Sequence, residues 1–230
     1  METADRATLY RFFALPAAAA HESWLAFMPP EVVSISRRSR LGTLILSRML
    51  TRHALLPEPR SFDLAAHYQW VLADSEKLMD AALRMGAITL GPRMATTIVR
   101  ERVRLYRSAL GDDLFREAVA AAAEKIADIP ASSLDARTSV DDLQDFTVRT
   151  GIALMLAVLP NDAMRSRLAV KLPHSLSASP GVELASYNKP AVLERLRAML
   201  SPHLPMSSPQ PVTDAGAAVP SPTPLPLAGA

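Results

Sequence analysis

The sequence predicts an all-α protein: a compact multi-helix single domain over residues 1–204, followed by a disordered proline-rich C-terminal tail over residues 205–230. Three observations support this prediction. Apolar residues make up 49% of the chain, glycine occurs only eight times, and β-branched alternation is rare. This composition favours helices over sheets. A chain of 230 residues is long enough to bury one substantial core.

The first thirty residues predict one short helix over residues 17–28. Pro16 fits a first helical turn, where its missing N–H costs nothing, and Pro29 and Pro30 end the helix. Residues 62–71 are expected to form a loop or a short helix.

Residues 40–56 predict a longer amphipathic helix. Its apolar residues fall near one face: Leu41, Leu44, Ile45, Met49 and Leu56. Arg48 and Arg52 form an i,i+4 pair that we place on another face.

Residues 75–86 predict the next helix, with Gly86 near its end or inside a close helix contact. Gly91 and Pro92 then mark the start of a strongly patterned helix over residues 92–110. At 100° per residue, four arginines of that helix fall within roughly 60° of one another: Arg93, Arg100, Arg104 and Arg107. The broad opposite face is apolar: Ile98, Val99, Val103, Leu105, Tyr106 and Leu110.

Three interpretations of this arginine stripe remain open. It can be a solvated or internally paired face, since residues 111–146 carry nine acids against three bases. It can be a protein-docking face, or it can bind nucleic acid. No aromatic residues interleave with the arginines, which argues against nucleic acid.

The rest of the domain carries clear helix signals. Asp112 and Asp113 suit the positive end of a helix dipole, and the alanine run over residues 118–123 implies a close helix–helix approach. Ser139 and Asp142 resemble a capping box. The helix that follows is apolar all round from Gly151 to residue 159, which predicts a central, enclosed helix.

The end of the domain is marked by further signals. Pro160 ends the central helix, and Asn161 or Asp162 caps a helix over residues 163–172. Residues 191–200 predict a last amphipathic helix. Eight of the nineteen prolines follow within the last thirty residues, which predicts the disordered tail.

No motif predicts catalysis. Cysteine is absent, and the five histidines form no HExxH, so we expect no metal and no cofactor. Neither a phosphate loop nor a nucleophile elbow occurs, so the chain is not expected to be an enzyme. No apolar stretch is long enough to span a bilayer, and acidic residues near the N-terminus oppose a signal peptide, so we expect a cytoplasmic protein.

Four stretches together resemble the SctK (YscK) family, an accessory component of bacterial type III secretion systems. The first is Tyr10-Arg-Phe-Phe-Ala-Leu-Pro-Ala-Ala-Ala-Ala-His21, and the second is Leu83-Arg-Met-Gly-Ala-Ile-Thr-Leu-Gly91 with Arg93, Ile98 and Val99. The third is Thr150-Gly-Ile-Ala-Leu-Met-Leu-Ala157 with Arg165, Leu168 and Lys171-Leu-Pro173, and the fourth is Pro190 with Leu193, Leu196 and Leu200. Their order and spacing over residues 10–204 carry the resemblance.

The resemblance implies an all-helical cytosolic adaptor without catalysis or cofactor. In that family the adaptor links the cytoplasmic domain of the inner-membrane ring protein SctD to the pod protein SctQ. SctQ connects it in turn to SctL and the ATPase SctN, so the protein supports protein secretion. It implies a peripheral position at the cytosolic face of the inner membrane, with no membrane insertion and no nucleic acid partner.

Two alternatives stand beside the adaptor. A helical nucleic-acid-binding or regulatory protein would use its arginine-rich helix faces, including Arg37 and Arg38, and would show salt-dependent retention. A helical enzyme or ligand carrier would have a pocket near Trp24, His67 or Trp70, with polar groups converging on it.

Overall fold

The chain folds into helices, as the composition predicts. The structure, a computed structural model, describes residues 6–59, 61–178 and 181–200. The α-helices are α1 (Arg6–Ala14), α2 (Pro30–Arg37), α3 (Arg40–His53), α4 (Ser75–Thr96), α5 (Arg100–Leu110), α6 (Asp112–Ala120), α7 (Ala131–Asp135), α8 (Val140–Ala157), α9 (Asp162–Lys171), α10 (His174–Ser177) and α11 (Lys189–Leu200). The 3-10 helices are η1 (Pro16–Ala18), η2 (Glu22–Leu25) and η3 (Ala66–Leu72). The tail predicted over residues 205–230 lies outside the described residues.

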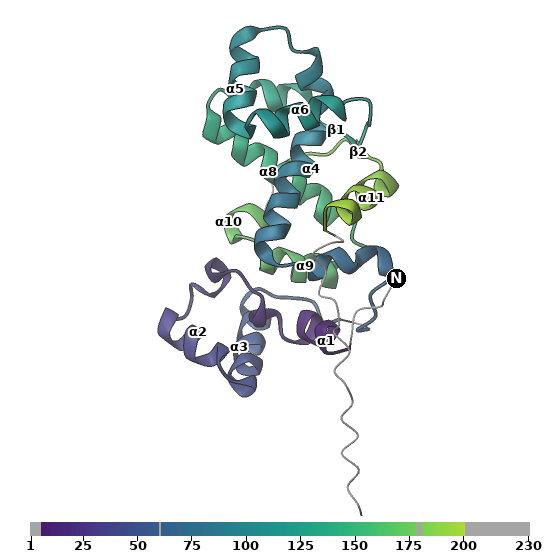
Figure 1. Cartoon of the computed structure of the whole chain (residues 1–230). Helices are drawn as coiled ribbons and strands as arrows, with labels where there is room; N and C mark the ends of the chain where they lie inside the picture. Colours follow the sequence, from purple (N-terminus) through teal and green to yellow (C-terminus); the bar gives the residue numbers. More distant parts are fainter. Residues whose placement is uncertain (1–5, 60, 179–180, 201–230) are drawn as a thin grey trace, which may run out of the picture.

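A short antiparallel pair of strands is the one feature of β structure in the described part of the chain. Strand β1 (Ala127–Asp128) pairs with β2 (Ser186–Tyr187), with Ala127 opposite Tyr187. The sequence pattern does not predict these strands. They tie the segment after α6 to the segment before α11 (Figure 1).

Helices α4 and α8 form the central pair of the fold (Figure 1). Their backbones approach so closely that a Cβ on Gly151 would lie 1.8 Å from the Ala82 carbonyl oxygen. A Cβ on Gly86 would lie 1.9 Å from the Thr147 carbonyl oxygen. Gly86 therefore lies in a close helix contact. The predicted enclosed helix is confirmed, because residues 151–155 are buried; α8 ends at Ala157.

Two apolar cores lie along this pair. The larger contains Trp70, Leu78, Met85, Ile152, Leu154, Met155, Leu168 and Leu196. The second lies between α4, α5, α6 and α8 and contains Leu90, Met94, Tyr106, Phe115, Leu143 and Phe146. In this second core a Cβ on Gly91 would lie 2.2 Å from the Ala118 carbonyl oxygen. The predicted close approach therefore falls at Ala118, and α6 ends at Ala120.

A third apolar cluster joins the N-terminal elements to α9. It contains Ala17, Leu25, Val33, Leu46, Leu50, Leu56 and Val170. The single helix expected over residues 17–28 is wrong, since η1 and η2 stand there instead. Their backbone groups serve tertiary contacts: Ala17 and Ala20 accept hydrogen bonds from the Arg37 guanidinium, and the His21 N–H donates to Val170.

The predicted caps of α8 and α9 are confirmed. Ser139 Oγ accepts a hydrogen bond from the Asp142 N–H at 3.1 Å, and Asn161 Oδ1 accepts one from the Met164 N–H at 2.9 Å. Each of these side chains satisfies a backbone donor that the first helical turn leaves free. Asp112 opens α6 as expected.

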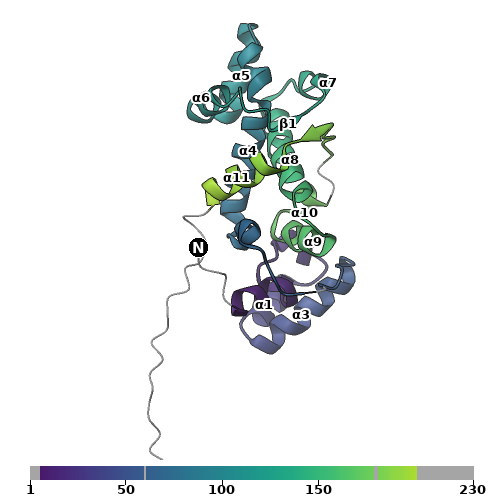
Figure 2. The ribbon, with the colours of Figure 1, turned by 90° about the vertical axis from the view of Figure 1, so that its right-hand side faces the viewer.

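The molecule is elongated, with different elements at its two ends. Two views at right angles place α5 and α6 at one end and α3 at the other, with α4 and α8 between them (Figures 1 and 2). Among the described residues, no helix is long and apolar enough to cross a membrane.

Candidate partner-binding surfaces

The four predicted site arginines do not share one helix. Helix α4 continues through Pro92 to Thr96, and α5 begins at Arg100. Arg93 therefore lies in the last turn of α4, while the other three lie on α5. The helix predicted over residues 92–110 is wrong, and its break falls at residues 97–99.

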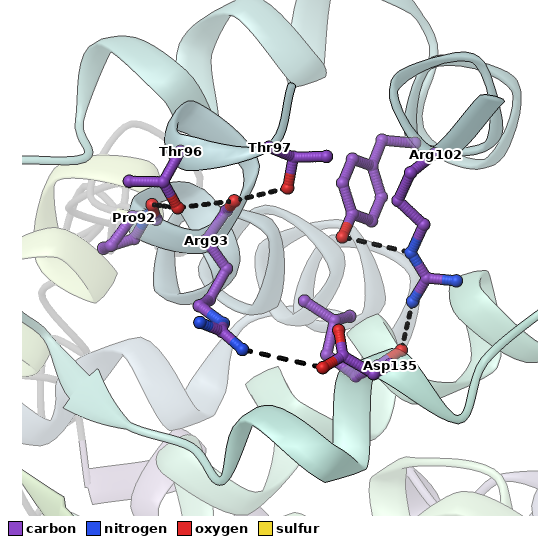
Figure 3. Close-up of polar contacts among 8 residues, drawn as sticks. Pro92, Arg93, Thr96, Thr97, Arg102 and Asp135 are labelled. Atoms are coloured by element: carbon purple, nitrogen blue, oxygen red, sulfur yellow. Dashed lines mark hydrogen bonds and ion pairs between the residues drawn. The ribbon is translucent and has the colours of Figure 1, made fainter. Parts of the chain in front are cut away.

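Threonine hydroxyls bond to carbonyl groups in the last turn of α4. Thr97 Oγ1 donates to the Arg93 carbonyl at 2.7 Å, and Thr96 Oγ1 donates to the Pro92 and Arg93 carbonyls at 3.1 Å (Figure 3). The Arg93 carbonyl is one of the last four of α4, which lack an intrahelical partner. The four residues from Thr96 to Val99 are all β-branched, which further disfavours helix. Pro92 stays within the helix, whose end lies four residues further on.

Two of the four arginines have acidic partners within the molecule. Arg93 lies 3.7 Å from Asp135 (Figure 3), and Arg107 lies 3.7 Å from Asp112. In both pairs the arginine and the aspartate side chains are about half exposed or more. Each pair therefore contributes at most about 1 kcal/mol to stability. The internally paired interpretation of the stripe therefore holds for Arg93 and Arg107.

Arg100 and Arg104 are exposed, and no acidic side chain of the described residues forms an ion pair with them. Ile98 and Val99 precede them and are 95% and 59% exposed. Their predicted place on a buried face is wrong, because residues 97–99 leave helical geometry. We call Ile98, Val99, Arg100 and Arg104 the α5 surface.

Arg102 is a structural arginine that the sequence pattern did not single out. Its guanidinium donates to the carbonyls of Leu134 and Arg137, and its Nε lies 3.3 Å from the Tyr106 hydroxyl (Figure 3). It thereby fixes α7 and the residues after it against α5. The i,i+4 spacing of Arg102 and Tyr106 is a sequence signal for their contact. The carbonyl partners of Arg102 lie more than thirty residues away, so no local pattern indicates them.

Most of the apolar face predicted for α3 faces solvent, although Leu44 is half-buried and Leu56, which follows the helix, is buried. Leu41, Ile45 and Met49 are 68%, 51% and 41% exposed. At 100° per residue they lie within about 100° of arc together with Arg48 and Arg52, which are also exposed. We call these five residues the α3 surface.

The buried side of α3 contains polar residues that find partners. Its buried residues are Thr43, Leu46, Ser47 and Leu50. Ser47 Oγ accepts a hydrogen bond from the Ala17 N–H at 3.2 Å, and Thr43 Oγ1 donates to the Ser39 carbonyl at 2.9 Å. Because these hydroxyls are satisfied, the less apolar side packs inward. The expectation that Arg48 and Arg52 form a separate face from the apolar residues is wrong.

The acidic segment after α5 pairs mostly within the molecule. Its ion pairs with described residues join Arg93 to Asp135, Arg84 to Glu117, Arg107 to Asp112, Arg116 to Asp113, Arg149 to Asp145 and Arg195 to Glu124. The Glu124 pair raises the pKa of Arg195 through a side-chain hydrogen bond. These contacts favour internal pairing over an acidic docking face.

The residues expected to line a ligand pocket have other roles. Trp24 Nε1 donates to the Leu172 carbonyl at 2.9 Å, Trp70 is buried in the main core, and His67 lies against Tyr68. Within the described ranges, no group of histidine and acidic side chains is arranged to hold a metal ion. No protein-family model, curated protein or solved structure matches the chain.

Proposed function

We propose that the chain is a non-catalytic helical adaptor of the type III secretion sorting platform. It joins an SctD-like inner-membrane ring protein to an SctQ-like pod protein, and through the pod protein it reaches SctL and SctN. The protein then acts in the cytoplasm, at the cytosolic face of the inner membrane, by binding alone.

One observation carries this proposal: the α3 surface and the α5 surface lie at opposite ends of an elongated molecule (Figures 1 and 2). Each combines exposed aliphatic side chains with exposed arginines that have no ion-pair partner among the described residues. Interfaces concentrate their energy in a few desolvated apolar anchors and arginines, while charge steers the encounter. Two such surfaces with the α4–α8 pair between them suit a protein that holds two partners apart.

The resemblance to the SctK family is the second support, and it names the partners. Its second and third stretches fall on α4 and α8. These stretches supply Gly86, Gly91 and Gly151, where neighbouring helices approach too closely for a Cβ. Gly86 and Gly151 lie at the contact between α4 and α8, and Gly91 lies at the contact between α4 and α6.

A pull-down with surface variants tests the proposal. The full chain is used as bait in cytosolic and detergent-solubilised membrane fractions of its native cells, at about physiological salt, which partly screens exposed charges. We expect recovery of an SctQ-like and an SctD-like protein. Ile98→Ser with Arg100→Glu should lose one of them, and Ile45→Ser with Arg48→Glu should lose the other, each by about 10-fold or more.

Arg116→Glu is the matched control, because Arg116 is an exposed helical arginine outside both surfaces. This control should retain both partners. The adaptor proposal is contradicted if the surface variants still recover both partners. It is also contradicted if nucleic acid is recovered in place of both proteins.

A further inference from the structure

A cleft of about 840 Å³ opens between α1, the α2–α3 corner and the end of α9. Figure 2 shows α1, α3 and α9 meeting in this part of the molecule. Its volume falls in the range of small-molecule sites, which is roughly 300–1,000 Å³. Apolar residues including Phe12, Leu15 and Leu72 form part of its lining.

The charged lining of this cleft is almost entirely positive. Its basic residues are Arg11, Arg37, Arg38, Arg40 and Lys171. Asp74 is the one acidic residue that the structure describes in the lining; it is 81% exposed and lies 3.6 Å from Lys77, outside the lining. In the part of the chain that the structure describes, no ion pair neutralises the four arginines.

Helix dipoles account for only some of these positions. Arg11 and Arg37 lie in the last turns of α1 and α2, and Lys171 ends α9, where cations are favoured. Arg38 is the C-cap of α2, where a cation is also favoured, but Arg40 is the first residue of α3, where the dipole opposes positive charge. Gathering five cations there costs electrostatic free energy that an anionic ligand would offset.

Two of the cations are held in place by the backbone. Arg37 donates to the carbonyls of Ala17 and Ala20, the latter at 2.6 Å. Lys171 is 5% exposed and donates to the carbonyls of Val71 and Ala73. These bonds orient the positive groups without removing their charge, so the site is formed before a ligand arrives.

We propose that this cleft binds a small molecule carrying two linked phosphates, the unit shared by inorganic pyrophosphate and nucleoside diphosphates. Guanidinium groups bind phosphate oxygens with two parallel hydrogen bonds, and each phosphate concentrates more charge than a carboxylate does. The exposed Arg11 and Arg40 would contact the phosphates at the mouth, with Arg37 and Lys171 providing positive potential deeper in the cleft. This site is separate from the α3 and α5 surfaces and does not depend on the adaptor proposal.

Calorimetric titration of the full chain with inorganic pyrophosphate tests the site, at about 50 mM salt to limit screening. We expect saturable binding of one pyrophosphate per chain. Arg11→Gln with Arg40→Gln should weaken it by about 10-fold or more, since charge-assisted bonds are lost. Both residues are exposed, and a thermal melt verifies that the variant remains folded.

Arg48→Gln with Arg52→Gln is the matched control, because both arginines are exposed on α3 and do not line the cleft. This control should bind pyrophosphate as the wild type does, and Arg11→Gln alone should weaken binding less than the pair. A specific site would bind pyrophosphate at about 1 mM, because that concentration corresponds to weak affinity. Absence of binding there overturns the proposal. Equal weakening in the control overturns it too, as does binding of a hexaglutamate peptide in preference to pyrophosphate.

Discussion

At the residue scale, the structural cations of this protein are satisfied by main-chain carbonyls. Arg37, Arg102, Arg167 and Lys171 each donate to carbonyl groups far away in sequence. A carbonyl compensates a buried cation in part, through hydrogen bonds without full charge neutralisation. Lys171 shows the consequence most clearly: desolvation by burial lowers its pKa to about 8, and nearby Asp74 partly opposes that shift.

Lys171 gives a pH prediction. Below about pH 8 both the folded and unfolded states carry its proton, so the cost of burying the charge is fully present. Between about 8 and 10.5 the unfolded state holds more protons, so the contribution of Lys171 to stability rises with pH. Urea unfolding of wild type and Lys171→Met across this window should show a difference that grows in favour of wild type. The slope should approach at most about 1.4 kcal/mol per pH unit, and a difference independent of pH contradicts the assignment.

At the element scale, α5 is fixed at one side and free at the other. Arg102 bonds to the segment around α7, whereas Arg104, two residues on, is exposed. The same short helix therefore supplies a structural contact and part of the α5 surface. Neighbouring arginines of identical chemistry have different roles because successive residues point about 100° apart.

The two arginines form a matched pair for hydrogen exchange. Arg102→Gln should raise amide exchange across residues 131–138, because α7 and the residues after it lose two of the hydrogen bonds that hold them to α5. Arg104→Gln should leave that exchange unchanged. Similar exchange in both variants would show that α7 is held by its apolar contacts instead.

At the scale of the whole molecule, the N-terminal elements and the α4–α8 pair meet through α9. Arg167 carries much of this junction: its Nε donates to the Phe13 carbonyl at 3.2 Å and its Nη1 to the Pro57 carbonyl at 2.7 Å. It is 4% exposed, and burial lowers its pKa. Trp24 adds a hydrogen bond to the Leu172 carbonyl. The distance between the α3 and α5 surfaces depends on this junction.

Replacing Arg167 tests the junction. Arg167→Met leaves the Phe13 and Pro57 carbonyls without a donor and should destabilise the chain by about 1–3 kcal/mol. Protease cleavage within residues 16–56 should increase more than cleavage within α4 or α8, since the loss is local. Trp24→Phe, which removes one hydrogen bond and keeps an aromatic side chain, should have a smaller effect of the same kind. Equal loss of protection in all segments would show that the molecule unfolds as one unit.

The sequence by itself determined the helical class, the enclosed helix α8 and the cap at Ser139, and it left Asn161 or Asp162 as the cap of α9, of which the structure has Asn161. These depend on composition and on contacts within a few residues, which a local pattern encodes. It also identified Arg100 and Arg104 as exposed cations.

Only the tertiary structure decided which apolar faces are covered. Leu41, Ile45 and Ile98 have the pattern of core residues, but no other described element covers them. Pro92 has the pattern of a helix start, yet α4 continues through it and ends four residues later at Thr96. Contacts between distant residues fix burial and the partners of Arg102, Arg167 and Lys171, so the periodicity of one segment cannot specify them.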